Sequence, residues 1–153
     1  MTRSHASGHA AVVTAPFVGR RDEDLEIAVI VPMYNTAPTV ASVIKDLVDA
    51  GAAEVLAIDN ASADGTVSEV AALAATDAGV RPVVTILQND RNLGYGGSIQ
   101  RGFAQLSGGT RYIAVMHSDD QCDVDSTLGS MLAAARSWPP DSSPLRTQGN
   151  TAA

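Results

Sequence analysis

The chain has 153 residues, an apolar fraction of 45% and a formal net charge of −7, which is the size and composition of one globular domain. Lysine and arginine form no cluster on any segment, so we expect no nucleic-acid partner, because such proteins carry a basic stripe. The apolar stretch over 10–18 is too short to span a bilayer, and the single cysteine, Cys122, excludes an internal disulfide, which fits a cytoplasmic protein.

The two ends of the chain differ from its middle in composition and periodicity. Residues 1–24 show neither helical nor strand periodicity, and residues 137–153 are rich in proline and serine. Such segments cannot bury enough apolar surface to fold. We therefore expect a flexible leader over 1–24, a folded domain over 25–136 and a disordered tail over 137–153.

Apolar runs and helical patterns alternate through the middle of the chain. An unbroken apolar run over 27–31, ended by Pro32, predicts a strand buried on both faces. The first helix follows Thr36 and stops at Gly51, with Val40, Val43, Ile44, Leu47 and Val48 on one face. The second helix, over 66–75, turns Val67, Val70, Ala71 and Ala74 inward. The remaining elements that we expect are strands over 54–59, 83–87 and 112–116 and helices over 98–106 and 125–136.

This alternation predicts a doubly wound α/β fold, with a mostly parallel, Rossmann-like sheet and helices on both faces. In such sheets, ligands bind at the carboxyl ends of the strands. Each expected strand is followed there by a polar or glycine-rich segment, at 32–36, 59–66, 89–97 and 117–123. These four segments are the candidate binding site.

In this order and spacing, the four segments resemble the donor-binding segments of family 2 glycosyltransferases, over about 26–132. The resemblance implies the nucleotide-sugar-binding part of a GT-A fold. The segment at 32–35 would line the base pocket, the end of the second strand would meet the base, and the glycine-rich segment would lie under the nucleotide. The donor-binding residues implied in this way are Pro32, Met33, Tyr34, Asn35, Asp59, Asn60, Gly94, Gly96 and Gly97.

Simpler roles remain open for the same residues. A carboxylate at a strand end can accept a hydrogen bond from a base, but Asp59 could instead only cap the following turn. Glycine lets the backbone approach a ligand, but the segment at 94–97 could instead be a tight turn that opens a helix. Thr36 stands where many family members have Glu, and Asn60 stands where many have a second Asp.

The segment after the fourth strand aligns with the Asp-x-Asp motif, which in this family holds Mg²⁺ or Mn²⁺ against the donor diphosphate. Asp119 matches the second aspartate, and Gln121 matches a position that adds an oxygen in members similar to dolichol-phosphate-mannose synthase. His117 replaces the first aspartate, and imidazole suits Mn²⁺ better than Mg²⁺. The alternative is that the carboxylates at 119–123 only form a solvated loop that caps a helix.

The resemblance implies metal-dependent transfer of a sugar from a UDP- or GDP-linked donor to a lipid phosphate, such as a polyprenyl phosphate, or to a glycan. The protein would be cytoplasmic, with peripheral association at the inner membrane face. The resemblance ends near Ala134, before the acceptor half and the catalytic base of the family, so no catalytic residue is assigned. We expect a truncated product, such as one caused by a shift of reading frame after Leu132.

Two other functional interpretations compete with an active transferase. The first is a catalytically inert remnant that still binds nucleotide. The second is an acidic, flavodoxin-like signalling domain, against which the polar segment at 59–65 argues.

Overall fold

The computed structural model describes residues 27–107, 112–121 and 123–137. The elements of this part of the chain are β1 (Ile27–Met33), α1 (Val40–Asp49), β2 (Glu54–Asp59), α2 (Thr66–Thr76), β3 (Val84–Gln88), α3 (Gly94–Gln105), β4 (Tyr112–Val115) and α4 (Val124–Ser137). The expected leader over 1–24, Cys122 and the expected tail after Ser137 lie outside the described residues. Among the described helices, none has the length and apolar character needed to cross a membrane.

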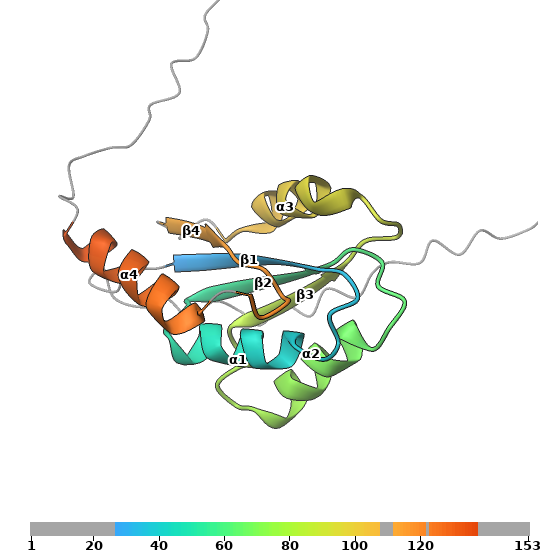
Figure 1. Ribbon diagram of the computed structural model, residues 1–153, viewed down its shortest axis with the longest axis horizontal. Helices are drawn as coiled ribbons and strands as arrows, with labels where there is room; N and C mark the ends of the chain where they lie inside the picture. Colours follow the sequence, from blue (N-terminus) through green and yellow to red (C-terminus); the bar gives the residue numbers. More distant parts are fainter. Residues whose placement is uncertain (1–26, 108–111, 122, 138–153) are drawn as a thin grey trace, which may run out of the picture.

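All strand pairs are parallel, and the strand order is β3-β2-β1-β4. The chain winds outward from β1 to β3 and then returns through α3 to place β4 on the other side of β1. Helix α3 covers one face of the sheet, and α1, α2 and α4 lie on the other face (Figure 1). The predicted doubly wound α/β fold is therefore confirmed. Its strand order reverses between β1 and β4, where a binding crevice opens in sheets of this kind.

The period of two in each strand divides the core into two layers. Val29, Val31 and Met33 of β1 pack with α1, α2 and α4, and Ile30 packs with Leu56 and other apolar residues on the α3 side. All seven residues of β1 are buried, as expected for a central strand between two helical layers. The core thus fixes β1, and with it the start of the candidate site.

Strand β1 continues through Pro32 to Met33, so the prediction that Pro32 ends it is wrong. Pairing with β4 stops at Ile30 and Val115, while pairing with β2 extends to Met33 and Asp59. The Pro32 carbonyl faces the β4 side, where it accepts a hydrogen bond from the Ser118 hydroxyl. The proline nitrogen lies on that same side beyond the paired region, so its missing N–H removes no ladder hydrogen bond.

The helices also depart from expectation at two places. Helix α3 begins at Gly94, four residues before the predicted start at Ser98, because the Asn92 side chain accepts the Gly94 N–H at 2.8 Å. Helix α2 buries Val70, but Ala71 is exposed rather than turned inward. It lies over the outer strand β3, where Ala71 lines an open depression together with Val84.

Candidate functional site

The polar segments that follow β1 and β2 are joined by reciprocal hydrogen bonds. The Asn35 N–H donates to Ser62 Oγ at 3.0 Å, and Asn35 Oδ1 accepts the Ala63 N–H at 2.8 Å. Asn35 has a φ of 53°, in the left-handed region that asparagine tolerates. Its amide oxygen is thus used within the protein, and its backbone turn leaves the neighbouring Tyr34 side chain 51% exposed.

A second link between these segments runs through Asp64 and Thr66. Asp64 Oδ2 accepts the Ala37 N–H at 3.1 Å, and Oδ1 accepts both the N–H and the hydroxyl of Thr66. The Thr66 oxygen in turn accepts the Thr36 N–H at 2.8 Å. The Thr66 hydroxyl is the main cause that lowers the pKa of Asp64 below its ordinary 3.8, and the backbone N–H groups of Thr66 and Ala37 add to it.

The direction of this pKa shift gives a prediction for acid conditions. Because the folded protein favours the Asp64 carboxylate, it contributes stability above the pKa of the unfolded chain, and that stability is lost as pH falls through the lowered folded pKa. The Asp64→Asn variant should therefore melt below the wild type at neutral pH, and the gap should close in strong acid. Thermal unfolding across a pH series measures this. A gap that widens in acid would contradict the assigned direction.

Asp59 at the end of β2 caps its own turn, as one of the two alternatives proposed. The residue is 2% exposed, and both of its carboxylate oxygens lie 3.3 Å from the Ser62 nitrogen. A carboxylate can accept about four hydrogen bonds. Because this contact is long and shared between both oxygens, the Asp59 carboxylate can still accept hydrogen bonds from a ligand. Its capping role therefore does not exclude recognition of a base.

Asn60 holds the third polar segment through its amide group. Its Oδ1 accepts Asn89 Nδ2 at 3.0 Å and the Leu93 N–H at 2.7 Å, and its Nδ2 donates to Asn92 Oδ1 at 2.7 Å. Asn89 also donates to Ser98 Oγ at 3.1 Å. Asn89, Asn92 and Ser98 were not among the predicted donor-binding residues. The sequence pattern that could have indicated this network is the presence of asparagine directly after two adjacent strands.

This asparagine network predicts that aspartate is poorly tolerated at position 60. Asn60→Asp would place a carboxylate oxygen against Asn92 Oδ1, which already accepts the Gly94 N–H, so the buried carboxylate at position 60 would face a second acceptor. We expect a loss of about 1–3 kcal/mol in the free energy of unfolding, the usual cost of a buried polar group left unpaired. Urea unfolding measures it, with Asp90→Asn in the exposed part of the same segment as the control. Equal stability of the two variants would show that the network is not needed.

A cavity of about 230 Å³ opens where these segments meet the start of α3. Of the predicted donor-binding residues, it brings together Pro32, Met33, Tyr34, Asn60 and Gly94. Asn92, Tyr95 and Ser98 complete the lining. Asn35, Asp59, Gly96 and Gly97 are not part of it.

The three glycines of the segment at 94–97 have different structural roles. Gly94 has a φ of 73°, which side chains rarely allow. A Cβ on Gly97 would lie 2.7 Å from the Leu93 Cβ, so Gly97 is needed for the tight start of α3. A Cβ on Gly96 would meet nothing within 4 Å, so this position faces open space. The glycine-rich segment thus opens a helix, and its Gly94 lines the cavity.

The segment after β4 is held to the start of α1 through Ser118. Ser118 is buried, its hydroxyl accepts from the Thr36 hydroxyl at 3.1 Å, and its carbonyl accepts from the Thr39 hydroxyl at 2.7 Å. The adjacent Asp119 has a buried Oδ1 with no hydrogen-bond partner among the described residues. A buried carboxylate oxygen is costly unless a cation or a donor reaches it.

His117 and Tyr95 face each other at this side of the site. Their rings stack with centroids 5.1 Å apart and planes 11° apart, and Tyr95 Oη lies 3.3 Å from His117 Nε2. Both side chains are exposed. The pair joins the first turn of α3 to the segment after β4.

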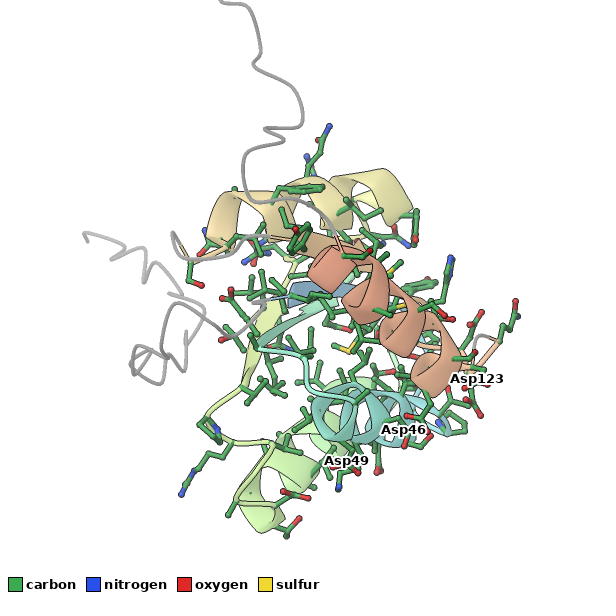
Figure 2. The ribbon with its side chains drawn as sticks, turned by 90° about the vertical axis from the view of Figure 1, so that its left-hand side faces the viewer. Asp46, Asp49 and Asp123 are labelled. Atoms are coloured by element: carbon green, nitrogen blue, oxygen red, sulfur yellow. The ribbon has the colours of Figure 1, made fainter. Side chains whose placement is uncertain are left out.

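The carboxylates near this segment do not gather into a ready-made metal site. No group of three or more His, Cys, Asp or Glu side chains suited to a metal ion occurs in the described ranges. Gln121 is exposed, and Asp123 lies at the beginning of α4, while Asp46 and Asp49 lie on α1 (Figure 2). The unpaired Asp119 oxygen fits a cation that takes most of its ligands from a bound anion such as a diphosphate.

The chain is similar to known proteins in both sequence and fold. The family model described as glycosyl transferase family 2 matches residues 28–145, further than the end near Ala134 that the sequence resemblance indicated. No curated protein matches the chain. The chain is similar to the mannosyltransferase PcManGT of Pyrobaculum calidifontis, solved in complex with GDP-Man and Mn²⁺, with 22% identity and a TM-score of 0.60 over 80% of this chain.

A second similar structure is glucosyl-3-phosphoglycerate synthase of Mycobacterium tuberculosis, solved with Mn²⁺, UDP and glucosyl-3-phosphoglycerate. It is 20% identical, with a TM-score of 0.47 over 71% of this chain. The chain spans only 35% of the first of these proteins and 41% of the second.

Proposed function

The chain belongs to glycosyl transferase family 2, and from this premise we propose that it binds a nucleotide sugar in the cavity between β1, β2 and α3 and serves sugar transfer to an acceptor. The observation that carries the proposal is the cavity itself. It lies at the carboxyl ends of parallel strands, and Tyr34 and Tyr95 line it with exposed rings. Aromatic rings beside backbone and amide groups suit a planar base.

The donor would lie along the sites that the family resemblance indicates. The base would enter between the end of β1 and the start of α3, where the Asp59 carboxylate would accept a hydrogen bond from it. The open backbone at Gly96 would allow the diphosphate to approach the first turn of α3. The sugar would then point toward the segment after β4.

Metal dependence is the second part of the proposal. The chain carries a net charge of −7, so an anionic nucleotide needs a cation to offset repulsion. Asp119 would hold Mn²⁺ or Mg²⁺ through the oxygen that lacks a partner, with Gln121 near enough in sequence to contribute. When bound, the cation would neutralise the charge that develops on the leaving diphosphate. Either ion fits this role, because the proposed ligand is a carboxylate oxygen, which suits both Mg²⁺ and Mn²⁺.

For the acceptor we propose a lipid phosphate, such as a polyprenyl phosphate, with a glycan as the alternative. This choice follows the His-x-Asp-x-Gln pattern at 117–121. A lipid acceptor would bring the protein to the inner face of the membrane. The competing function is a nucleotide-binding remnant that transfers nothing, and it makes the same binding predictions.

The test is thermal unfolding with UDP, GDP and ADP, each with Mn²⁺, with Mg²⁺ and with a chelator. A ligand present at ~100 times its Kd adds about 2.7 kcal/mol to the stability of the folded state. We expect UDP or GDP to raise the unfolding midpoint slightly in chelator and much further with metal, with ADP as the control for binding of any metal–diphosphate. The absence of a shift from a cooperatively folding protein would refute the donor site. Release of the nucleoside diphosphate from a nucleotide sugar, in the presence of acceptor, separates the transferase from the remnant.

A further inference from the structure

We propose that His117 acts on the nucleotide site through Tyr95, as one half of an aromatic brace across the cleft, and not as a metal ligand. The brace is defined as the stacked rings of Tyr95 and His117. The inference rests on the proposed nucleotide-binding function. It assigns His117 as a positioning residue, because the cavity lining includes Tyr95 but not His117.

The first observation is that the brace spans two sides of the site. Tyr95 belongs to the first turn of α3, and His117 follows β4 by two residues. The rings stack 5.1 Å apart and also share the 3.3 Å contact between Oη and Nε2. Because Nε2 is engaged by the phenol, this nitrogen is poorly placed to bind a cation at the same time.

The second observation concerns what can hold the glycine-rich turn in place. In the run Gly94-Tyr95-Gly96-Gly97, only Tyr95 has a side chain. The asparagine network fixes the turn from one side, through the Leu93 and Gly94 N–H groups. Tyr95 is therefore the one side chain of the turn that can anchor its other side. The His117 ring is the surface on which it rests.

The third observation is that the chain offers another metal ligand close by. Asp119 has an unpaired carboxylate oxygen, and a cation that binds together with a diphosphate needs few protein ligands. The brace therefore predicts that loss of the His117 ring weakens nucleotide binding even when no metal is present. A ligand role for His117 predicts an effect only with metal.

The experiment measures the Kd of UDP and GDP by calorimetry, in chelator and in Mn²⁺, and the Mn²⁺ affinity by electron paramagnetic resonance. The variants are His117→Ala, His117→Phe, His117→Asp and Tyr95→Ala. Phe103→Ala, an exposed aromatic residue on the same helix that does not line the cavity, is the control. His117→Phe keeps a ring without a ligating nitrogen, and His117→Asp supplies a ligand without a ring.

We expect His117→Ala and His117→Asp to weaken nucleotide binding in chelator by roughly 3- to 10-fold, the range of one aromatic pair. His117→Phe should restore it, and Tyr95→Ala with His117→Ala should be no worse than Tyr95→Ala alone. In the unliganded protein, the amide resonances of Gly94, Gly96 and Gly97 should move in His117→Ala and return in His117→Phe.

The opposite pattern would overturn the brace. If His117→Asp keeps full affinity while His117→Phe loses Mn²⁺ and binds nucleotide normally in chelator, His117 is a metal ligand. Additive losses in the double variant would also overturn it. Failure of the wild type to bind nucleotide in either buffer would instead refute the proposed function on which the inference rests, and the glycine resonances would still report whether the rings are coupled.

Discussion

Replacing Asp119 with asparagine is expected to abolish the metal-dependent part of nucleotide binding while leaving the unliganded protein as stable as before, or more stable. The carboxylate has one buried oxygen without a partner among the described residues, so its burial carries an uncompensated cost. Asparagine keeps the shape and removes the charge. Loss of a group that only hydrogen-bonds to a metal ligand lowers metal affinity by about 10- to 100-fold. Loss of the proposed ligand itself should therefore lower metal affinity by more than about 100-fold.

Two measurements on one sample check this expectation. Thermal unfolding without ligand should show an equal or higher midpoint for Asp119→Asn, and the additional shift that Mn²⁺ gives in the presence of nucleotide should vanish. Asp120→Asn is the matched control, since it makes the same charge change in an exposed neighbour whose φ of 59° suits asparagine. A full ligand-induced shift in Asp119→Asn would remove Asp119 from the proposed site.

The expected effects of Asp119→Asn on the stability of the unliganded protein and on metal-dependent binding have opposite signs, and this distinguishes two roles for Asp119. If Asp119 only capped the helix that follows, replacing it would lower the stability of the unliganded protein. If Asp119 serves to bind a cation, the unpaired carboxylate lowers that stability, and replacing it would not. The alternative interpretation, in which the acidic segment merely caps α4, therefore predicts a lower midpoint for Asp119→Asn. In the structure, that capping contact is made by Asp123, whose Oδ1 accepts the Ser126 N–H at 3.3 Å.

The fold could be predicted from the sequence because its signals are local. A central strand buried on both faces needs an unbroken apolar run, and β1 and β2 have one. Helix α1 shows its buried stripe as a 3.6-residue period, and Val40, Val43, Ile44 and Leu47 are buried as predicted. The end of β1 was misplaced at Pro32, because whether a proline costs a hydrogen bond depends on where the neighbouring strand stops.

The site could be predicted only in outline, because its details depend on contacts between segments far apart in the chain. The rule that ligands bind at the carboxyl ends of parallel strands selected four segments, and three of them contribute residues to the cavity. It could not show that the amide group of Asn60 is hydrogen-bonded to Asn89, Asn92 and Leu93. Nor could it show that His117 has Tyr95 as its neighbour, since the two are 22 positions apart.

The packing of α3 against the sheet likewise depends on a contact between residues far apart in the chain. Gly102 faces β1, and a Cβ at that position would lie 2.7 Å from Ile30 Cγ2 and about as close to two further atoms of that side chain. Ile30 is fully buried, so it has no room to move aside. Helix α3 can therefore approach the sheet only because residue 102 has no side chain. Its first turn carries the glycine-rich segment of the site.

Gly102→Val is accordingly expected to lower the free energy of unfolding by at least about 3 kcal/mol, the upper range for overpacking a core. Gly129→Val is the matched control, because a Cβ at this position of α4 meets nothing within 4 Å and the variant should stay within about 0.5 kcal/mol of the wild type. Urea unfolding of both variants measures the difference. Pairing Gly102→Val with Ile30→Ala should cost less than the sum of the two single losses, because the smaller side chain vacates the space that valine needs. Strict additivity would mean that the Gly102 contact with Ile30 does not set the distance between α3 and β1, and therefore does not position the cavity.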